Sequence, residues 1–532
     1  MATVPLTSAT RRGYALGSVA TGAFGTVPGL LLLPYLTDRL GITAAVAGLI
    51  VLLPKAWDVI LNPVAGGISD RSTHPDGRRR PFLLKAGIAL AITFVLIFWG
   101  PTPPTASPTT AATWVIVAFV ACASAYAFFQ VPYVAMPAEM TDDYDERTRL
   151  MSWRVAVLAL AILVSGGASP AIRDALGPVW GYRGVGLFVG ALLLTGALGA
   201  WWGTRHTSDP YAAPPATEAA ASPPPVHNPP IGRLVTGRPS EATASPPPVH
   251  NPPIGRLVTG RPTEATAPSL LTQLRVVAHA ADFRRLLTTF VIQALGIGVM
   301  LAGVDYLARV VLARPGASSI LFICFVGPAL LVTPIWQRLS ARLGKRAGYV
   351  LSSLLLATGA LLTVPTTSLT PMAAAVALIG VGYAGAQMFP LAMLADTAAV
   401  DTARTGASRA GVYTGVWTAT ETLGMAVGPF LYAALLAVSG YVSSTTGQVA
   451  QPESAVTAIR LGFGVLPAGL VLVSLVFLAR YRLDATTVAA ATAATTGTAA
   501  TAATAATAAT PTPETAVTEA GPSTAPAEES HP

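Results

Sequence analysis

The chain has 532 residues, of which 52% are hydrophobic and only 11% are charged. Because a soluble domain carries about 25% charged residues, this composition excludes an ordinary soluble protein and predicts an all-α membrane protein. The formal net charge of +8 does not indicate a nucleic-acid-binding face, because the arginines lie in short loops between apolar runs, where they set topology.

A series of about twelve apolar segments runs along the chain, each close to the ~20 residues that a helix needs to cross a bilayer. None of them shows the short period-two alternation of a transmembrane β-strand. The first six spans are predicted at 13–35, 42–68, 82–100, 112–140, 155–172 and 185–204. The second six are predicted at 286–312, 318–336, 348–365, 372–395, 411–440 and 461–479.

Lysine and arginine are concentrated in alternate connections between these spans. One set of connections holds clusters such as Arg78–Arg80 and Arg338–Arg346, whereas the other set holds single arginines such as Arg39 and Arg314. Because basic loops stay on the cytoplasmic side, both termini are predicted to be cytoplasmic in a multi-pass protein of the cell (inner) membrane. This orientation requires an even number of spans.

Two segments, 205–285 and 483–532, lack membrane character. The first contains a Pro-rich unit that starts at Ser222 and recurs almost unchanged from Ser245. Such a repeat cannot bury a core and predicts an extended, disordered cytoplasmic linker, although its Pro-Pro-Pro runs could also dock a partner domain. The second is an Ala/Thr-rich repeat with no apolar face, which predicts a disordered tail.

The chain is therefore expected to fold as two six-helix bundles, at 1–204 and 286–482. Six spans, a long linker and six more spans are the layout of the major facilitator fold. Carriers with this fold bind solute near the bilayer midplane between the two halves.

The stretch from Trp57 to Pro81 places an acid inside an apolar run. Asp58 lies in the predicted span, where a charge costs about 2.5–3.5 kcal/mol on insertion scales and is a functional candidate by default. Lys55 is three residues earlier on the same helix face. We predict a coupling carboxylate whose ionisation is tuned by Lys55; the alternative is a structural ion pair that locks the bundle.

Three motifs carry a resemblance to a known family: W-D-V-I-L-N-P-V-A-G-G-I-S-D-R…G-R-R-R-P from Trp57, Q-V-P-Y-V-A-M-P-A-E-M-T-D-D-Y-D-E-R-T-R-L from Gln130, and R-A-G-V-Y-T-G-V-W-T-A-T-E-T-L-G-M-A-V-G-P from Arg409. With them the chain resembles the glycoside–pentoside–hexuronide:cation symporters of the major facilitator superfamily, which include the melibiose permease. The resemblance implies a secondary active transporter, not an enzyme, that carries a sugar or glycoside by symport with Na⁺, Li⁺ or H⁺.

The resemblance also implies roles for individual residues. It places the cation site mostly on the second span, at Asp58, with Asn62 where the family often has an acid. Gln130 stands where the melibiose permease has a sugar-binding acid, and Arg154 matches a family arginine near the sugar site. Gly22, Leu61 and Thr422 depart from the family pattern.

Further polar and aromatic residues on the spans are candidates for solute contacts. The amides of Asn62 and Gln130 can donate to and accept from sugar hydroxyls, or can join helices by hydrogen bonds. Glu421, four residues after Trp417 on the same face, is a second coupling candidate. Asp305 is a weaker one, because Arg309 can pair with it. The aromatic candidates, for which core packing is the alternative, are Tyr126, Tyr133 and Trp417.

Charged residues at the cytoplasmic ends of the spans are predicted to form a gate. The resemblance to the family fold implies ion pairs between the halves that latch the outward-facing state, and the alternative is solvated charge that only sets topology. The gate candidates are Asp70, Arg71, Arg78, Glu139, Asp142, Arg147 and Asp396.

Other functions are weighed against this one. An exporter or a carrier of a lipid-like, hydrophobic solute on the same fold is the main alternative, because the family's sugar-site acids are missing. A membrane enzyme is disfavoured, since no nucleophile motif and no metal-ligand spacing occurs. We expect a monomer with no cofactor or metal, whose partners are the solute, the coupling ion and the lipid bilayer.

Overall fold

The computed structural model describes residues 6–103, 105–141, 144–205, 280–314, 316–405, 410–445, 449–484 and 486–491. Most of the predicted linker and tail therefore lies outside the described residues. The part of the chain that is described contains helices and connections but no strand.

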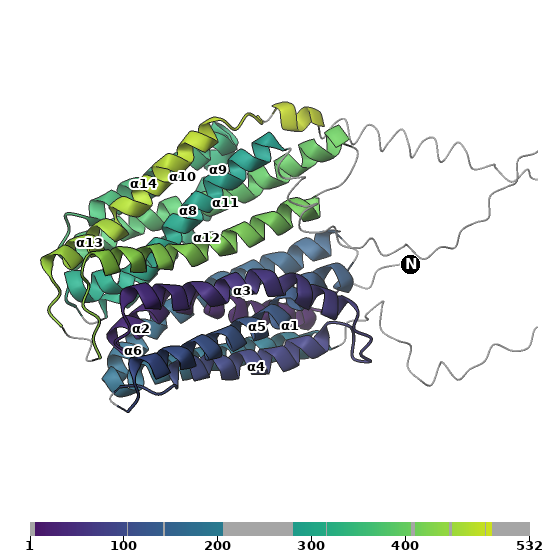
Figure 1. Cartoon of the computed structure of the whole chain (residues 1–532). Coiled ribbons are helices and arrows are strands. Elements are labelled where there is room, and N and C mark those ends of the chain that lie inside the picture. Colours follow the sequence, from purple (N-terminus) through teal and green to yellow (C-terminus); the bar gives the residue numbers. More distant parts are fainter. Residues whose placement is uncertain are drawn as a thin grey trace, which may run out of the picture.

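The helices form two bundles, which we call the N half and the C half (Figure 1). The N half comprises α1 (Ser8–Val27), the π-helical turn η1 (Pro28–Leu32), α2 (Leu33–Asp38), α3 (Ala44–Asp70), α4 (Arg80–Phe98), α5 (Pro108–Met140) and α6 (Tyr144–Gly203). The C half comprises α8 (Ala281–Tyr306), the π-helical turn η2 (Leu307–Val311), α9 (Ala317–Leu343), α10 (Lys345–Thr363), α11 (Leu369–Thr405), α12 (Ala410–Val438), α13 (Glu453–Phe463) and α14 (Val465–Ala479).

The predicted spans correspond to these helices. Within the described residues, 11 helical stretches are long and apolar enough to cross a membrane. One of them lies within α6, which joins the two predicted spans 155–172 and 185–204 and reverses at Gly177, where φ is 73°. A left-handed φ suits glycine, and the turn is tight enough that a Cβ on Gly181 would lie 2.4 Å from the carbonyl oxygen of Arg173. Counting α6 twice gives six spans in each half.

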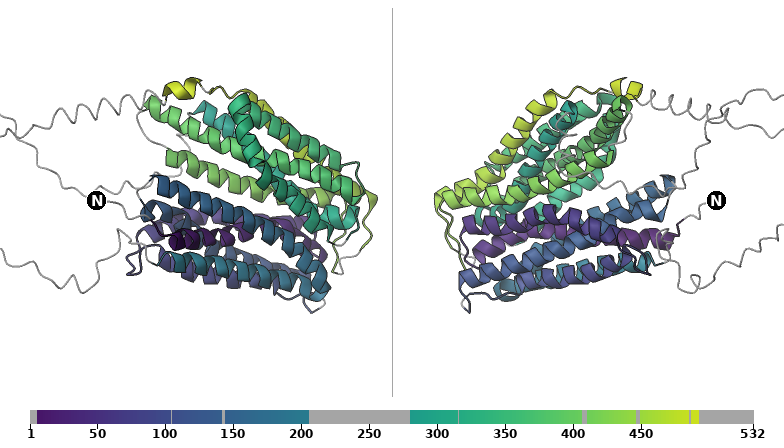
Figure 2. Two further views of the ribbon diagram at one scale, coloured as in Figure 1. Left: turned by 180° about the vertical axis from the view of Figure 1, so that it is seen from behind. Right: turned by 45° about the vertical axis from the view of Figure 1, so that its right-hand side comes forward.

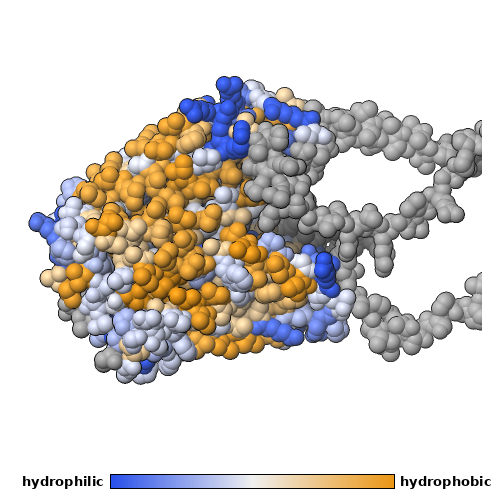
Figure 3. All heavy atoms as spheres, in the orientation of Figure 1, coloured by the Kyte–Doolittle hydropathy of each residue, from blue (hydrophilic) through white to orange (hydrophobic). Residues whose placement is uncertain are grey.

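The surface of the helices matches a membrane environment. Large apolar side chains are exposed on it, for example Ile60 at 64% and Leu331 at 79%. Figure 3 shows them as a continuous hydrophobic region over both halves, with hydrophilic residues toward the ends. Helices satisfy their own backbone hydrogen bonds, which is what a bilayer core demands. Where α5 begins, Ser107 accepts a hydrogen bond from the Thr110 amide and Pro108 occupies the first helical position, a standard start signal.

The two halves approach each other at the end remote from Ser8 and Ala479, which we call the opposite end; the other end, where α1 begins and α14 ends, is the terminal end. Figures 1 and 2 show the halves inclined to one another, so that they diverge toward the terminal end. Glycines permit the close approach, since a Cβ on Gly29 would lie 2.7 Å from Leu301 and one on Gly48 would lie 2.7 Å from Ala433. Small residues serve this purpose between membrane helices generally.

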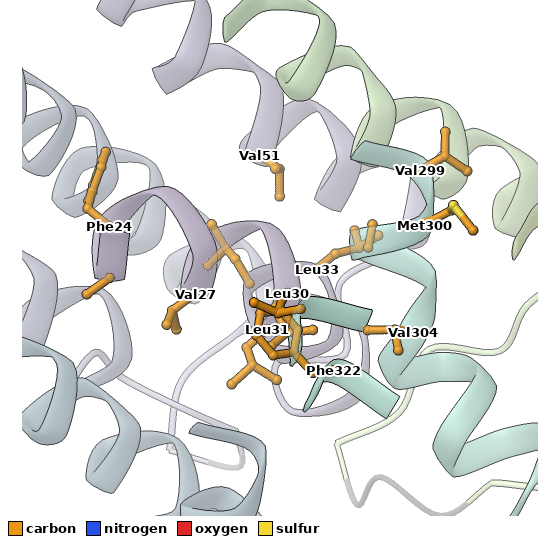
Figure 4. Close-up of a cluster of buried hydrophobic side chains, with 14 of the residues drawn as sticks. Phe24, Val27, Leu30, Leu31, Leu33, Val51, Val299, Met300, Val304 and Phe322 are labelled. Carbon is orange, nitrogen blue, oxygen red and sulfur yellow. The ribbon is translucent and has the colours of Figure 1, made fainter. Parts of the chain in front are cut away.

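An apolar seal fills the space between the halves near the opposite end (Figure 4). Its side chains are buried and belong to one core cluster. The seal residues are Val27, Leu30 and Leu31 from the N half and Met300, Val304 and Phe322 from the C half. This packing excludes water from the route between the halves at that end.

Candidate functional site

Asp58 is held inside the N half by α3, a continuous helix that contains Pro54 and Pro63. Its side chain is buried at 3% exposure, and its Oδ1 atom has no hydrogen-bond partner. Lys55 does not form an ion pair with it; the Lys55 ammonium instead lies 4.7 Å from the centroid of the Phe24 ring, a cation–π geometry. The structural ion pair considered as the alternative is therefore not formed. Burying a carboxylate oxygen without a partner costs free energy, so this position favours the binding of a proton or a cation.

The neighbours of Asp58 come from α5 and α1. Tyr126 lies within electrostatic range of Asp58 and stacks on Phe24, with ring centroids 4.1 Å apart. One turn further along α5, the Gln130 side-chain oxygen accepts a hydrogen bond of 2.7 Å from the Thr21 hydroxyl. The predicted candidates Asp58, Tyr126 and Gln130 thus gather where α1, α3 and α5 meet.

This cluster faces the C half. Along the continuous helix formed by α1 and η1, Thr21, Gly25 and Gly29 are spaced by four residues and share one face. Gly29 meets Leu301 of the C half, and a Cβ on Gly25 would meet nothing within 4 Å. The Thr21–Gln130 hydrogen bond therefore lies on the surface of the N half that faces the C half.

The predicted residues of α3 share that orientation. Lys55 and Asn62 follow Gly48 at intervals of seven residues, or two helical turns, so all three lie on one face. Gly48 is in contact with Ala433 and Phe430 of α12. Lys55 and Asn62 are both half-buried, as expected of side chains beside the space between the halves.

Two aromatic candidates lie elsewhere. Tyr133 is fully buried, stacks on Tyr14 at 4.7 Å, and donates a hydrogen bond of 2.9 Å to the Tyr14 carbonyl. Trp417 is 1% exposed and stacks on Phe290 of α8 at 4.2 Å. Both rings pack inside their own halves, as the core-packing alternative expects. The Arg154 guanidinium lies 5.6 Å from the Tyr133 ring and shares this packing.

Glu421 belongs to a second polar cluster, in the C half. It is half-buried on α12 and within electrostatic range of Tyr383 on α11. The Tyr383 hydroxyl accepts a hydrogen bond of 3.2 Å from the Gln387 amide, and its ring lies 4.9 Å from that of Phe325. Sequence reasoning missed Tyr383 and Gln387.

A repeat in the sequence could have revealed them. The pattern Tyr-x₃-Gln-x₅-Met-x₂-acid occurs on α5 and again, with identical spacing, on α11. The four positions are Tyr126, Gln130, Met136 and Glu139 on α5, and Tyr383, Gln387, Met393 and Asp396 on α11. In each half the tyrosine ring packs against a phenylalanine ring, and the tyrosine and glutamine side chains are both partly exposed.

The gate candidates for which the described residues show an ion pair form it within their own half. At the terminal end, Glu139 accepts hydrogen bonds from Arg78 at 3.0 Å and Arg79 at 2.7 Å, and Lys345 donates to Asp396 at 2.6 Å. Asp70 pairs with Arg79 at 2.8 Å. Arg71 is exposed. The remaining two candidates, Asp142 and the side chain of Arg147, lie outside the described residues.

Ion pairs between the halves occur at the opposite end, where the sequence analysis did not predict them. Arg309 of the C half donates to Asp38 of the N half at 2.5 Å, and Arg173 of the N half donates to Asp305 of the C half at 2.7 Å. The predicted Asp305–Arg309 pair is confirmed, with Nε 2.7 Å from Oδ2. The sequence does contain a signal for these pairs, because Asp38 and Arg173 lie just beyond the apolar spans predicted at 13–35 and 155–172.

Two further contacts between the halves surround these pairs. The Tyr441 hydroxyl donates to Asp38 at 2.8 Å, and the Gly316 amide donates to Asp174 at 3.0 Å. Burial, with the Asp38 carboxylate beside it, raises the pKa of Tyr441 far above its ordinary value. The hydroxyl therefore stays protonated and remains a donor.

The sequence is similar to a family model and to several known proteins. Residues 13–228 and 258–485 match the family model described as MFS/sugar transport protein. The chain is 25% identical, over 88% of its length and 92% of the relative, to a glucuronide carrier protein homolog of Escherichia coli (strain K12). It is also 25% identical, over 89% of its length and 93% of the relative, to an uncharacterized symporter of a Synechocystis species.

Solved structures agree on the fold. A bacterial homolog of the human lysosomal transporter Spinster, in an inward-facing and unoccupied conformation, superposes with a TM-score of 0.57 at 16% identity, covering 91% of this chain and 96% of that one. With the family model matched over both halves, the chain belongs to the MFS/sugar transport protein family of major facilitator transporters and is not an enzyme.

Proposed function

We propose that this protein imports a glycoside-like solute together with Na⁺ or H⁺ by alternating access, with both termini in the cytoplasm. The observation that carries the proposal is Asp58, a buried carboxylate with a partnerless oxygen among side chains that face the C half. A carboxylate that binds a cation in one conformation and releases it in another is the simplest coupling device for such a site.

The solute class is supported by the chemistry of the two repeated pairs. Tyr126 and Gln130, like Tyr383 and Gln387, combine an aromatic face with amide and hydroxyl groups that can both donate and accept. These are the groups that a polyhydroxylated ring with apolar C–H faces can use. The names of the relatives, a glucuronide carrier homolog and a symporter, are consistent with this class of solute and with a coupled ion.

The orientation is supported by charge. Arg78, Arg79 and Lys345 lie at the terminal end, where they pair with helix-end acids. By the positive-inside rule this end is cytoplasmic. Because the seal and the pairs between the halves close the opposite end, the described conformation corresponds to an inward-facing state.

Transport in proteoliposomes tests the coupling role, with 4-nitrophenyl β-D-glucuronide as the probe. With an imposed inward Na⁺ or H⁺ gradient, we expect the parent protein to accumulate the probe and an ionophore to abolish the accumulation. Asp58→Asn should lose gradient-driven accumulation while retaining probe exchange, because its site stays neutral in every conformation. The exposed acid change Glu453→Gln is the matched control and should transport normally.

Two outcomes would contradict the proposal. If Asp58→Asn accumulates the probe as the parent does, Asp58 is not the coupling group. If the parent instead fills everted vesicles with a hydrophobic solute under an H⁺ gradient and ignores glycosides, the protein is an exporter of the alternative class.

A further inference from the structure

The charged side chains at the opposite end form one continuous chain of contacts. In order, Tyr441 contacts Asp38, Asp38 contacts Arg309, Arg309 contacts Asp305, Asp305 contacts Arg173, and Arg173 contacts Asp174, which accepts from the Gly316 amide. The sequence of contacts passes between the N half and the C half four times. No comparable crossing ion pair occurs at the terminal end among the residues that the structure describes.

Burial makes these contacts consequential. Asp305 is 0% exposed and also accepts a hydrogen bond of 2.7 Å from Ser318, so both its oxygens are satisfied. Arg173 and Asp38 are buried too. Removing one partner of a buried pair leaves an uncompensated charge, whereas a complete pair is tolerated. If separation of the two halves left these charges unpaired, it would cost free energy, and the network would oppose the separation.

The distribution of charge between the halves lowers the free-energy cost of separating them. When the halves separate, Asp305 stays with Arg309, four residues away on the same helix, at 2.7 Å. Arg173 stays with its neighbour Asp174, at 2.8 Å. Each half therefore retains a ready-made ion pair, and Asp38 borders a surface cavity of about 560 Å³ through which water can reach it.

We infer that these residues form a reversible latch, which holds the opposite end closed and opens without leaving an unpaired buried charge in either half. The latch is defined as Asp38, Arg173, Asp174, Asp305, Arg309 and Tyr441. Its role depends on the alternating access in the proposed function, but not on which solute or ion is carried.

Distances between spin labels test the latch without any solute. In a background with Cys122→Ala and Cys324→Ala, labels at Thr43→Cys in the N half and Val442→Cys in the C half report on the opposite end, since both side chains are exposed there. Double electron–electron resonance in lipid nanodiscs gives the distance distribution. A second pair, Thr43→Cys with Thr109→Cys, lies within the N half and monitors its fold.

Asp38→Asn and Arg173→Gln each remove crossing contacts while leaving the Asp305–Arg309 pair intact. We expect each to raise the ratio of long to short distances about tenfold or more, the value of one charge-assisted hydrogen bond. The double variant should make the long distance dominant. Arg314→Gln removes an exposed arginine at the same end and should leave the distribution unchanged.

The latch is refuted if the double variant keeps the parent distribution while the pair within the N half is unchanged. Should the double variant fail the fold control, the two single variants decide, because each removes a different set of crossing contacts. Failure of glycoside transport would refute the proposed solute and leave this measurement unaffected.

Discussion

At the scale of single residues, hydropathy alone identified Asp58, because an acid within an apolar span has few structural uses. Its surroundings were not predictable in the same way. The ring of Phe24, which contacts both Lys55 and Tyr126, is an ordinary core residue in the sequence and gains its role only from the packing of α1 against α3 and α5. Tyr133 and Trp417 show the converse, since an aromatic residue on a span can face either way and only the packing decides.

Asp305 should be essential for stability. Asp305→Asn removes the charge that Arg173 and Arg309 share, so it leaves the buried Arg173 and the half-buried Arg309 without full compensation. We expect a loss of about 3–5 kcal/mol, the typical cost of breaking a buried ion pair. Thermal unfolding followed by intrinsic fluorescence measures it, with the exposed change Asp76→Asn as a control that should alter the midpoint little. Equal midpoints for Asp305→Asn and the parent would contradict the pairing.

The repeated glutamines should contribute equally to solute binding. Gln130→Ala and Gln387→Ala each remove one hydrogen-bonding group, and we expect each to weaken binding by about 1 kcal/mol, or about fivefold in Kd. Isothermal titration calorimetry with 4-nitrophenyl β-D-glucuronide is the measurement. Gln293→Ala is the matched control, because that amide is buried and bonded to Ser353 and Ser474 inside the C half. Unchanged affinity in Gln387→Ala would confine the solute site to the N half.

At the scale of elements, the sequence located the spans well but not their interruptions. The predicted spans coincide with α3, α4 and α5 in the N half and with the long helices of the C half. Runs of apolar residues are the strongest sequence signal in a membrane protein. The π-helical turns η1 and η2 carry no distinctive pattern in the sequence. Each follows the first helix of its half, and they lie beside the seal and the latch; π-turns inside helices are frequent at functional sites.

The reversal of α6 gives a direct test of an element boundary. Gly177 has φ of 73° and open space where a Cβ would be placed. Gly177→Ala should therefore lower the free energy of unfolding by about 1–2 kcal/mol through backbone strain alone. Gly469, on α14, has the same open space but no left-handed φ. Gly469→Ala should therefore be neutral or slightly stabilising, because alanine favours helix. Thermal unfolding compares the two variants, and equal effects would show that Gly177 is not strained.

At the scale of the whole molecule, the layout of two six-span halves followed from composition, span count and the basic loops. What the sequence could not predict is the conformational state. Charges at the terminal end were expected to bridge the halves, yet Glu139 and Asp396 pair within their own halves and the bridging charges lie at the opposite end. Such side chains can have different partners in different states, so a linear pattern cannot specify which contact is present.

The lengths of α5 and α11 have a consequence for how the protein sits in its bilayer. With 33 and 37 residues, these helices are about 50 and 55 Å long, against a hydrocarbon thickness of about 30 Å. Even when tilted, they project into the headgroup layer on the side where Glu139 and Asp396 are paired. Hydrophobic mismatch then acts on those helix ends directly, so that bilayer thickness and headgroup charge become variables that bias the balance between the inward-facing and outward-facing states.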